Sequence, residues 1–139
     1  MDKFTRNYTI ILTALTVFLL IWVFYEPPAV SRLNQLLKEN AEVAAYPYRF
    51  RVLKLEDGVA TMGTPRSANF SAYRALIIFY PELKNQPLDS LEVVKAQQEL
   101  ARIQGIAKGI VARSDGVDRV VWALDTNWLH SVGIDPDLP

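Results

Sequence analysis

The residues that usually carry catalytic or metal chemistry are scarce in this chain. It has no cysteine and a single histidine, His130, which excludes thiolate nucleophiles, disulfides and cysteine-ligated metal sites. His130 is close in sequence to Asp125, Asp135 and Asp137, a group that could bind a metal ion weakly. Because no second histidine supports such a site, we interpret His130 as a surface residue and expect no metal and no cofactor.

No arrangement of a nucleophile with a base can be built from the sequence. Ser90 and Ser131 lie in segments without the glycine pattern of a nucleophile elbow, and no glycine-rich phosphate loop is present. A pair of buried carboxylates in a cleft is the remaining route to hydrolysis, but no feature indicates one. We therefore expect no enzymatic activity and no small-molecule substrate.

Three residues are candidates for contact with a partner or an anion. Arg66 is in a polar loop, residues 63–71, whose hydroxyls and guanidinium could hold a carboxylate; an ordinary solvated loop would have the same composition. Phe70 in this loop is either tucked beneath it or part of a contact surface. Trp128 could anchor a partner, as tryptophans often do, or belong to the core.

The overall charge argues against nucleic acid as a partner. The chain has 15 Lys and Arg against 15 Asp and Glu, so its formal net charge is zero. A neutral chain has no long-range field that attracts phosphate backbones.

The elements that would position these residues begin with an uncharged run from Asn7 to Tyr25. At about 1.5 Å per residue this run spans close to the hydrocarbon core of a bilayer. Tyr8 at one end and Trp22 and Tyr25 at the other are typical of interfacial anchors. We predict a short N-terminus at 1–6, a transmembrane helix at 7–26 and a diproline linker at 27–30, where proline ends the helix.

Two alternatives for this run stay open. It could be a signal peptide cleaved near Ala29–Ser31, although it is long for that role and ends in bulky aromatic residues. It could also be a buried core helix, although such helices seldom lack charge over this length. Lys3 and Arg6 precede the run and Glu26 follows it, so the positive-inside rule predicts a cytoplasmic N-terminus. In a bacterium the rest of the chain would then be periplasmic, on the outer side of the inner membrane.

One face of the predicted membrane helix carries Thr9, Thr13 and Thr16. Small hydroxyl residues let membrane helices pack closely and form hydrogen bonds with one another, which predicts a helix partner. The alternative is that each threonine bonds its own backbone and faces lipid. No ionisable residue lies within the run, which argues against a role in proton transfer.

Residues 31–134 are predicted to form one α+β domain, with a tail at 135–139. We expect a two-layer sandwich of two main helices on about four mostly antiparallel strands. The predicted elements are a helix at 31–44 capped by Ser31, strands at 48–52, 59–62, 73–80 and 117–125, a long helix from Asp89 or Ser90, and a short helical turn at 126–132 closed by Gly133.

Local signals support several of these elements. Asp57-Gly58 favours a two-residue hairpin turn, and Asp89 with Glu92 fits a capping box. Gly116 fits the left-handed position after a helix. Ala101, Gly105 and Gly109 form a stripe of small residues on the long helix, which we interpret as close packing on its own sheet rather than a seam with another molecule.

Two short stretches are similar to a known pattern: Asp-Gly-Val-Ala-Thr-Met-Gly-Thr at 57–64 and Gly-Val-Asp-Arg-Val at 116–120. They resemble the bacterial envelope module called the BON domain, in which a Gly-Val hairpin strand is followed by a helix and a Gly-Val-x-x-Val strand. This resemblance implies helices on a small mixed sheet, binding of phospholipid or envelope proteins, and no catalytic residues. It covers a minor part of the chain. A long segment that includes 73–80 stands between the motifs, where the family has almost no residues.

The sequence thus leads to two hypotheses. The first is a non-enzymatic, single-pass accessory or assembly subunit of a larger inner-membrane protein complex. The second is an envelope-binding module that recognises lipid headgroups or peptidoglycan through the Arg66 loop.

Overall fold

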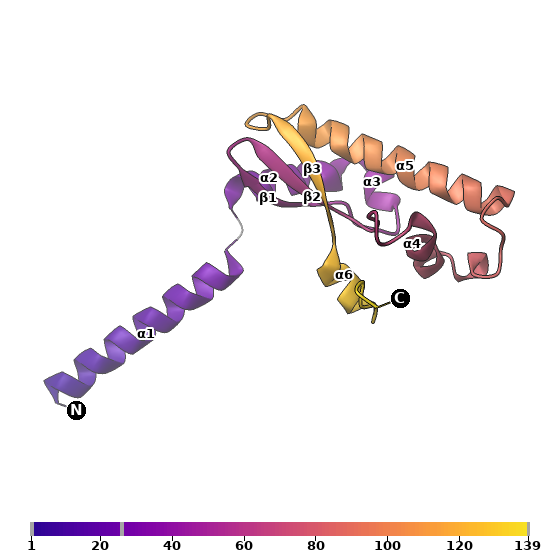
Figure 1. Cartoon of the computed structure of the whole chain (residues 1–139). Coiled ribbons are helices and arrows are strands. Elements are labelled where there is room, and N and C mark those ends of the chain that lie inside the picture. Colours follow the sequence, from indigo (N-terminus) through magenta and orange to yellow (C-terminus); the bar gives the residue numbers. More distant parts are fainter. Residues whose placement is uncertain (1, 26, 139) are drawn as a thin grey trace.

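The computed structural model describes residues 2–25 and 27–138, and it shows an α+β domain preceded by an apolar helix (Figure 1). Met1, Pro139 and Glu26, the residue used above in the charge argument, lie outside the described residues. The elements are α1 (Lys3–Phe24), α2 (Pro28–Glu39), α3 (Ala41–Ala45), β1 (Val52–Glu56), β2 (Val59–Thr64), α4 (Ala72–Phe79), the 3₁₀ turn η1 (Pro81–Leu83), α5 (Leu91–Ala112), β3 (Arg119–Leu124) and α6 (Thr126–Ser131).

The N-terminal helix α1 extends away from the domain, and none of its residues is buried (Figure 1). It begins earlier than predicted because Asp2 caps it, accepting a hydrogen bond of 2.7 Å from the Thr5 backbone N–H. It ends at Phe24, and Pro28 occupies the first turn of α2. An apolar helix that ends before the two prolines is confirmed. The linker predicted at 27–30 is wrong, because residues 28–30 already belong to α2, whose first turn accommodates proline.

The single helix predicted at 31–44 is wrong. The structure has α2 from Pro28 to Glu39 and then the short α3, separated at Asn40. The Asn40 side chain accepts hydrogen bonds from the backbone N–H groups of Glu42 and Val43, so it starts a new helix instead of continuing the first. Ser31 lies inside α2 and is not its cap.

The sheet has three strands in the order β1-β2-β3, so the expectation of four mostly antiparallel strands is wrong. The predicted hairpin joins β1 and β2 antiparallel, with positive φ angles at Asp57 (51°) and Gly58 (78°). The β3 strand pairs with β2 in parallel, because α4 and α5 carry the chain back across the domain between them.

The strand predicted at 73–80 is a helix, α4, and this correction removes the fourth strand. Ser71 caps α4, accepting a hydrogen bond of 3.2 Å from the Arg74 N–H. Ala75 and Leu76 are its buried residues. A short run that is apolar on both sides cannot be assigned to strand or helix by periodicity alone, and here the capping serine is the stronger signal.

The strand predicted at 48–52 is only partly formed. Tyr48, Phe50 and Val52 are buried in alternation with Arg49 and Arg51, as expected. The strand β1 nevertheless begins only at Val52. The Arg51 carbonyl still accepts a hydrogen bond of 3.0 Å from the Gly63 N–H, so the chain just before β1 stays beside β2 although the pairing there is irregular.

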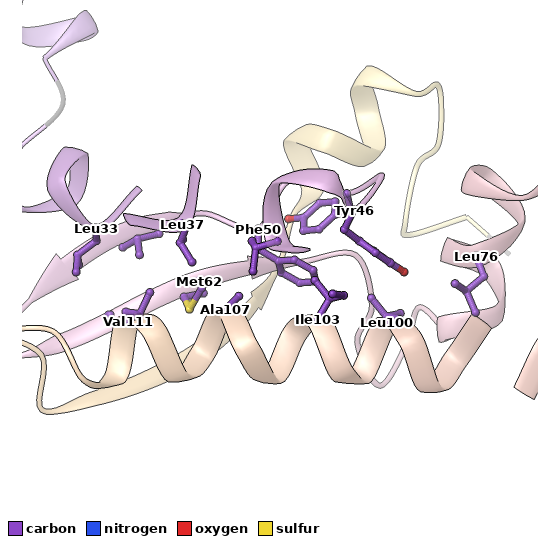
Figure 2. Close-up of a cluster of buried hydrophobic side chains, with 14 of the residues drawn as sticks. Leu33, Leu37, Tyr46, Phe50, Met62, Leu76, Leu100, Ile103, Ala107 and Val111 are labelled. Carbon is purple, nitrogen blue, oxygen red and sulfur yellow. The ribbon is translucent and has the colours of Figure 1, made fainter. Parts of the chain in front are cut away.

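The long helix α5 supplies much of the core. Its cap is Ser90, which accepts a hydrogen bond from the Val93 N–H, so the capping box predicted from Asp89 and Glu92 is not formed. Its buried face packs against side chains from α2 and the sheet. Figure 2 shows this core, with Leu100, Ile103, Ala107 and Val111 of α5 facing Leu33, Leu37, Phe50 and Met62.

The stripe of small residues on α5 does not pack on the sheet, so that interpretation is wrong. Ala101 and Gly105 are exposed, and a Cβ atom placed on Gly105 would meet no heavy atom within 4 Å. By contrast, a Cβ atom on Gly63 would lie 2.9 Å from the Tyr48 hydroxyl. Gly63, in β2, is thus a glycine that close packing requires.

These two glycines give a paired stability prediction. Gly105→Ala should raise the free energy of unfolding by about 0.8–1 kcal/mol, because it removes the helix-propensity cost of glycine without a clash. Gly63→Ala should lower it by about 1–3 kcal/mol through overpacking. Urea unfolding of the full chain in detergent micelles, followed by tryptophan fluorescence, measures both changes. A destabilising Gly105→Ala would show that another surface already covers this face of α5.

Candidate functional site

The first candidate surface is the threonine face of α1. The Thr9 hydroxyl donates a hydrogen bond of 2.9 Å to the Thr5 carbonyl, and the Thr16 hydroxyl does the same to Leu12. These bonds match the alternative in which threonines satisfy their own helix. They do not occupy the surface of the face, so a helix partner there stays a prediction.

The aromatic residues predicted as interfacial anchors all lie at the surface. Tyr8, Trp22 and Tyr25 are at opposite ends of α1, and Trp22 is 73% exposed. The helix is long and apolar enough to cross a membrane, which is consistent with a membrane anchor or a signal sequence. An apolar surface of this size needs lipid or protein to cover it.

The Arg66 loop is better ordered than its composition indicates. The Arg66 Nε donates a hydrogen bond of 3.2 Å to the side-chain oxygen of Gln104 on α5. The same oxygen accepts a bond of 3.4 Å from the Thr64 hydroxyl. Gln104 therefore holds the Arg66 guanidinium against α5.

The other two aromatic candidates belong to the interior of the domain. Phe70 is 1% exposed and packs with Ala75 and Leu129, so it is tucked beneath its loop and is not a contact residue. The Arg74 guanidinium lies over its ring at 4.4 Å. Trp128 is half-buried.

The Trp128 ring packs against other aromatic side chains of the domain. Its centroid lies 5.1 Å from that of Tyr48 and 5.4 Å from that of Phe79. Such edge-to-face and tilted arrangements are favourable aromatic contacts. The structure therefore supports the core alternative for most of this side chain.

Asp125, which the sequence analysis considered only as a sequence neighbour of His130, is the centre of a buried polar cluster. The Asp125 side chain is 2% exposed and accepts hydrogen bonds from the Tyr48 hydroxyl (2.8 Å) and the Trp128 backbone N–H (3.1 Å). It also pairs with the Arg51 guanidinium at 3.0 and 3.3 Å. The sequence signal was an aspartate directly before a short helix, which is a common capping position.

The environment of the Tyr48 phenol follows from this cluster. Burial raises its pKa, and the hydrogen bond to Asp125 raises it further. The phenol therefore stays protonated and keeps donating to the carboxylate. Both carboxylate oxygens of Asp125 already accept hydrogen bonds within the domain. We therefore interpret this cluster as structural and not as a free acid or base.

A second tyrosine has no such partner. Tyr46 is 8% exposed, and its hydroxyl has no hydrogen-bond partner among residues 2–25 and 27–138. Burial raises its pKa, with a smaller contribution from Tyr80 and Glu99. It borders a hollow of about 330 Å³, whose other lining residues are Glu42, Ala45, Pro47, Tyr80, Glu99, Arg102 and Ile103.

The charged residues around this hollow are one arginine and two glutamates. Arg102 forms ion pairs with both Glu42 and Glu99. The three side chains are about half exposed, which makes such pairs weak. The single cation is thus shared between two carboxylates within the hollow's own wall.

No metal site is visible in the described part of the chain. His130 is exposed in the last turn of α6. Across 2–25 and 27–138, no group of three or more histidine, aspartate or glutamate side chains gathers where it could hold a metal ion.

Comparisons with other proteins find no relative. No protein-family model, no curated protein and no solved structure matches the chain. The resemblance to the BON domain therefore stays a prediction that rests on the two short motifs.

The two buried tyrosines give a matched test of the polar cluster. Tyr48→Phe should lower the free energy of unfolding by about 1.5–3 kcal/mol, because a buried carboxylate loses a donor. Tyr46→Phe should leave it unchanged or raise it by about 1 kcal/mol, because the hydroxyl it removes has no partner. Urea unfolding monitored by circular dichroism compares the variants, and equal losses would contradict the assignment of Asp125 as the structural centre.

Proposed function

We propose that the chain is a non-enzymatic, single-pass accessory or assembly subunit of a larger inner-membrane protein complex. The helix α1 anchors it, and the domain from Pro28 onward is periplasmic. The observation that carries the proposal is α1 itself: 22 residues, with none buried against the rest of the chain. The core forms from residues beginning at Val30, so the domain does not need α1 to complete its packing.

The composition of α1 supports a spanning helix. Its charges, Lys3 and Arg6, are confined to its first two turns, and aromatic residues lie at both ends. Transfer of such a run into hydrocarbon is favourable because helix formation satisfies its backbone hydrogen bonds internally. The basic residues at its start favour a cytoplasmic N-terminus.

Two further features favour an accessory role over an independent activity. The threonine face of α1 offers a close-packing surface to another membrane helix. In the domain, the buried Asp125 is fully used in structural contacts. Assembly with other proteins is then the role that both parts of the molecule fit.

The first test concerns anchoring and orientation. We expect the full chain to remain in the membrane after alkaline carbonate extraction, with an intact mass that includes residues 2–25. A C-terminal alkaline phosphatase fusion should be active, because its enzyme folds only outside the cytoplasm. A shortened product that begins near Ser31 would show a cleaved signal peptide, and an inactive fusion would reverse the orientation.

The second test concerns the complex. Purification of the full chain in mild detergent should retain a stoichiometric set of membrane proteins, identified by mass spectrometry. Changing Thr9, Thr13 and Thr16 to leucine should reduce their recovery at least several-fold, because bulkier side chains prevent close helix packing.

A matched control places three leucines on the opposite face of α1. Ile11, Ala14 and Phe18 lie there by the 3.6-residue period, and their replacement should leave the recovery unchanged. If nothing copurifies with the native chain, the complex loses its support. Flotation with lipid vesicles and binding to peptidoglycan would then test the envelope-binding alternative.

A further inference from the structure

The two edge strands of the sheet, β1 and β3, differ in how open they are to pairing with another strand. The edge of β1 is closed at Val52: its N–H donates to the Asn34 side-chain oxygen at 2.6 Å, and its carbonyl accepts from the Asn34 amide at 3.1 Å. Farther along, Lys54 and Glu56 are exposed. Capping by a side chain and exposed charges are both common ways to prevent another strand from pairing.

The edge of β3 has no such protection. The Arg119 N–H donates to the Gly58 carbonyl and the Asp125 N–H to the Thr64 carbonyl, so the odd-numbered residues of β3 face β2. In a parallel ladder the alternate residues direct their N–H and C=O groups to the other side. These are Val120, Trp122 and Leu124, and no other described strand pairs with them.

The side chains along this edge favour strand addition. From Val120 to Leu124 the strand has no charge and no proline, the two residue types that usually discourage pairing. All five residues are half-buried. An extended segment placed beside β3 would find six residues of regular strand to pair with.

A hollow of about 200 Å³ lies next to this edge, on the side of the sheet that α5 covers. It is lined by Arg66, Ala101, Gln104, Gly105, Lys108 and Trp122, and we call it the basic hollow. Its two charged side chains are both positive, and no acidic side chain lines it. The absence of a side chain on Gly105 leaves it open.

We propose that the edge of β3 takes up an extended segment of a partner protein as a fourth strand. An acidic side chain of that segment enters the basic hollow between Arg66 and Lys108. Backbone hydrogen bonds to Val120, Trp122 and Leu124 supply affinity, and the carboxylate supplies specificity, as is usual when a peptide extends a sheet. This inference rests on the proposed function, since it names the kind of segment through which a larger complex would hold the domain.

A second copy of this chain fits the same edge less well. Antiparallel pairing of two β3 strands would place the partner copy's Val120, Trp122 and Leu124 on the α5 side of the sheet. None of these three side chains is a carboxylate that could pair with Arg66 or Lys108. Charge complementarity therefore selects an acidic segment from another protein.

The test uses the full chain in detergent micelles and a blocked heptapeptide, acetyl-Thr-Val-Thr-Glu-Thr-Val-Thr-amide. When the peptide forms a strand, both of its valines and its glutamate lie on one face. In ¹⁵N-resolved NMR, we expect the amides of Val120, Trp122 and Leu124 to exchange with solvent at least tenfold more slowly when the peptide is saturating. The amides of Val121 and Ala123, which face β2, serve as internal controls and should change little.

Three comparisons test the role of the basic hollow. A peptide with glutamine in place of glutamate should bind at least fivefold more weakly. Lys108→Gln and Gly105→Leu should each weaken the binding of the glutamate peptide by at least fivefold. Lys108→Gln removes a positive charge, and Gly105→Leu fills the hollow. Neither substitution should prevent folding, since Lys108 is exposed and a Cβ at position 105 meets no atom within 4 Å.

Other outcomes would overturn the proposal. If millimolar peptide leaves amide exchange at Val120, Trp122 and Leu124 unchanged, the β3 edge is not a binding site. If the glutamate and glutamine peptides bind with equal affinity, the site does not require an acidic residue. Protection that appears without peptide and grows with protein concentration would assign the edge to a second copy. If the peptide fails while a complex still copurifies through α1, the proposed function survives and only the β3 site is lost.

Discussion

The fold depends on one buried carboxylate. Asp125 accepts hydrogen bonds from the Tyr48 hydroxyl and the Arg51 guanidinium, both in the segment that precedes β1. It also caps α6, which follows β3. A buried carboxylate without partners would cost several kcal/mol, so these segments must be in place together. Gly63 completes the arrangement, because a side chain there would occupy the space of the Tyr48 hydroxyl.

The features that the sequence predicted correctly are those whose causes are local. The apolar run of α1, its end before the two prolines and the Asp57-Gly58 hairpin each depend on a few neighbouring residues. Gly116 has the predicted left-handed backbone, with φ 84°, but it does not cap α5, which ends at Ala112 with Arg113 as its C-cap. The buried face of α5 follows from its helical period. The composition of a turn or helix is enough to predict such elements, because the interactions that form them lie within the same segment.

The errors arose where contacts between distant segments decide the outcome. The run at 73–80 is apolar enough for a central strand, but Ser71 caps it as a helix, and the central position of the sheet belongs to β2, between β1 and β3. The stripe that includes Gly105 looked like a packing surface, yet α5 buries the face that carries Ile103 and Ala107 instead. The role of Asp125 depends on Tyr48, far away in sequence. Spacing along the chain does not show which partner a residue will meet.

The surface of α1 and the edge of β3 are both left without a partner within the chain. Together they affect how tightly the edge of β3 must bind. If α1 holds the chain in the same membrane as its partner, an extended segment of that partner meets the edge of β3 at a high effective concentration. A contact that would be weak between free molecules then becomes nearly intramolecular. The basic hollow need not bind tightly to be selective, because its charge distinguishes acidic from neutral segments while the anchor supplies proximity. Closure of the β1 edge by Asn34 restricts this addition to β3.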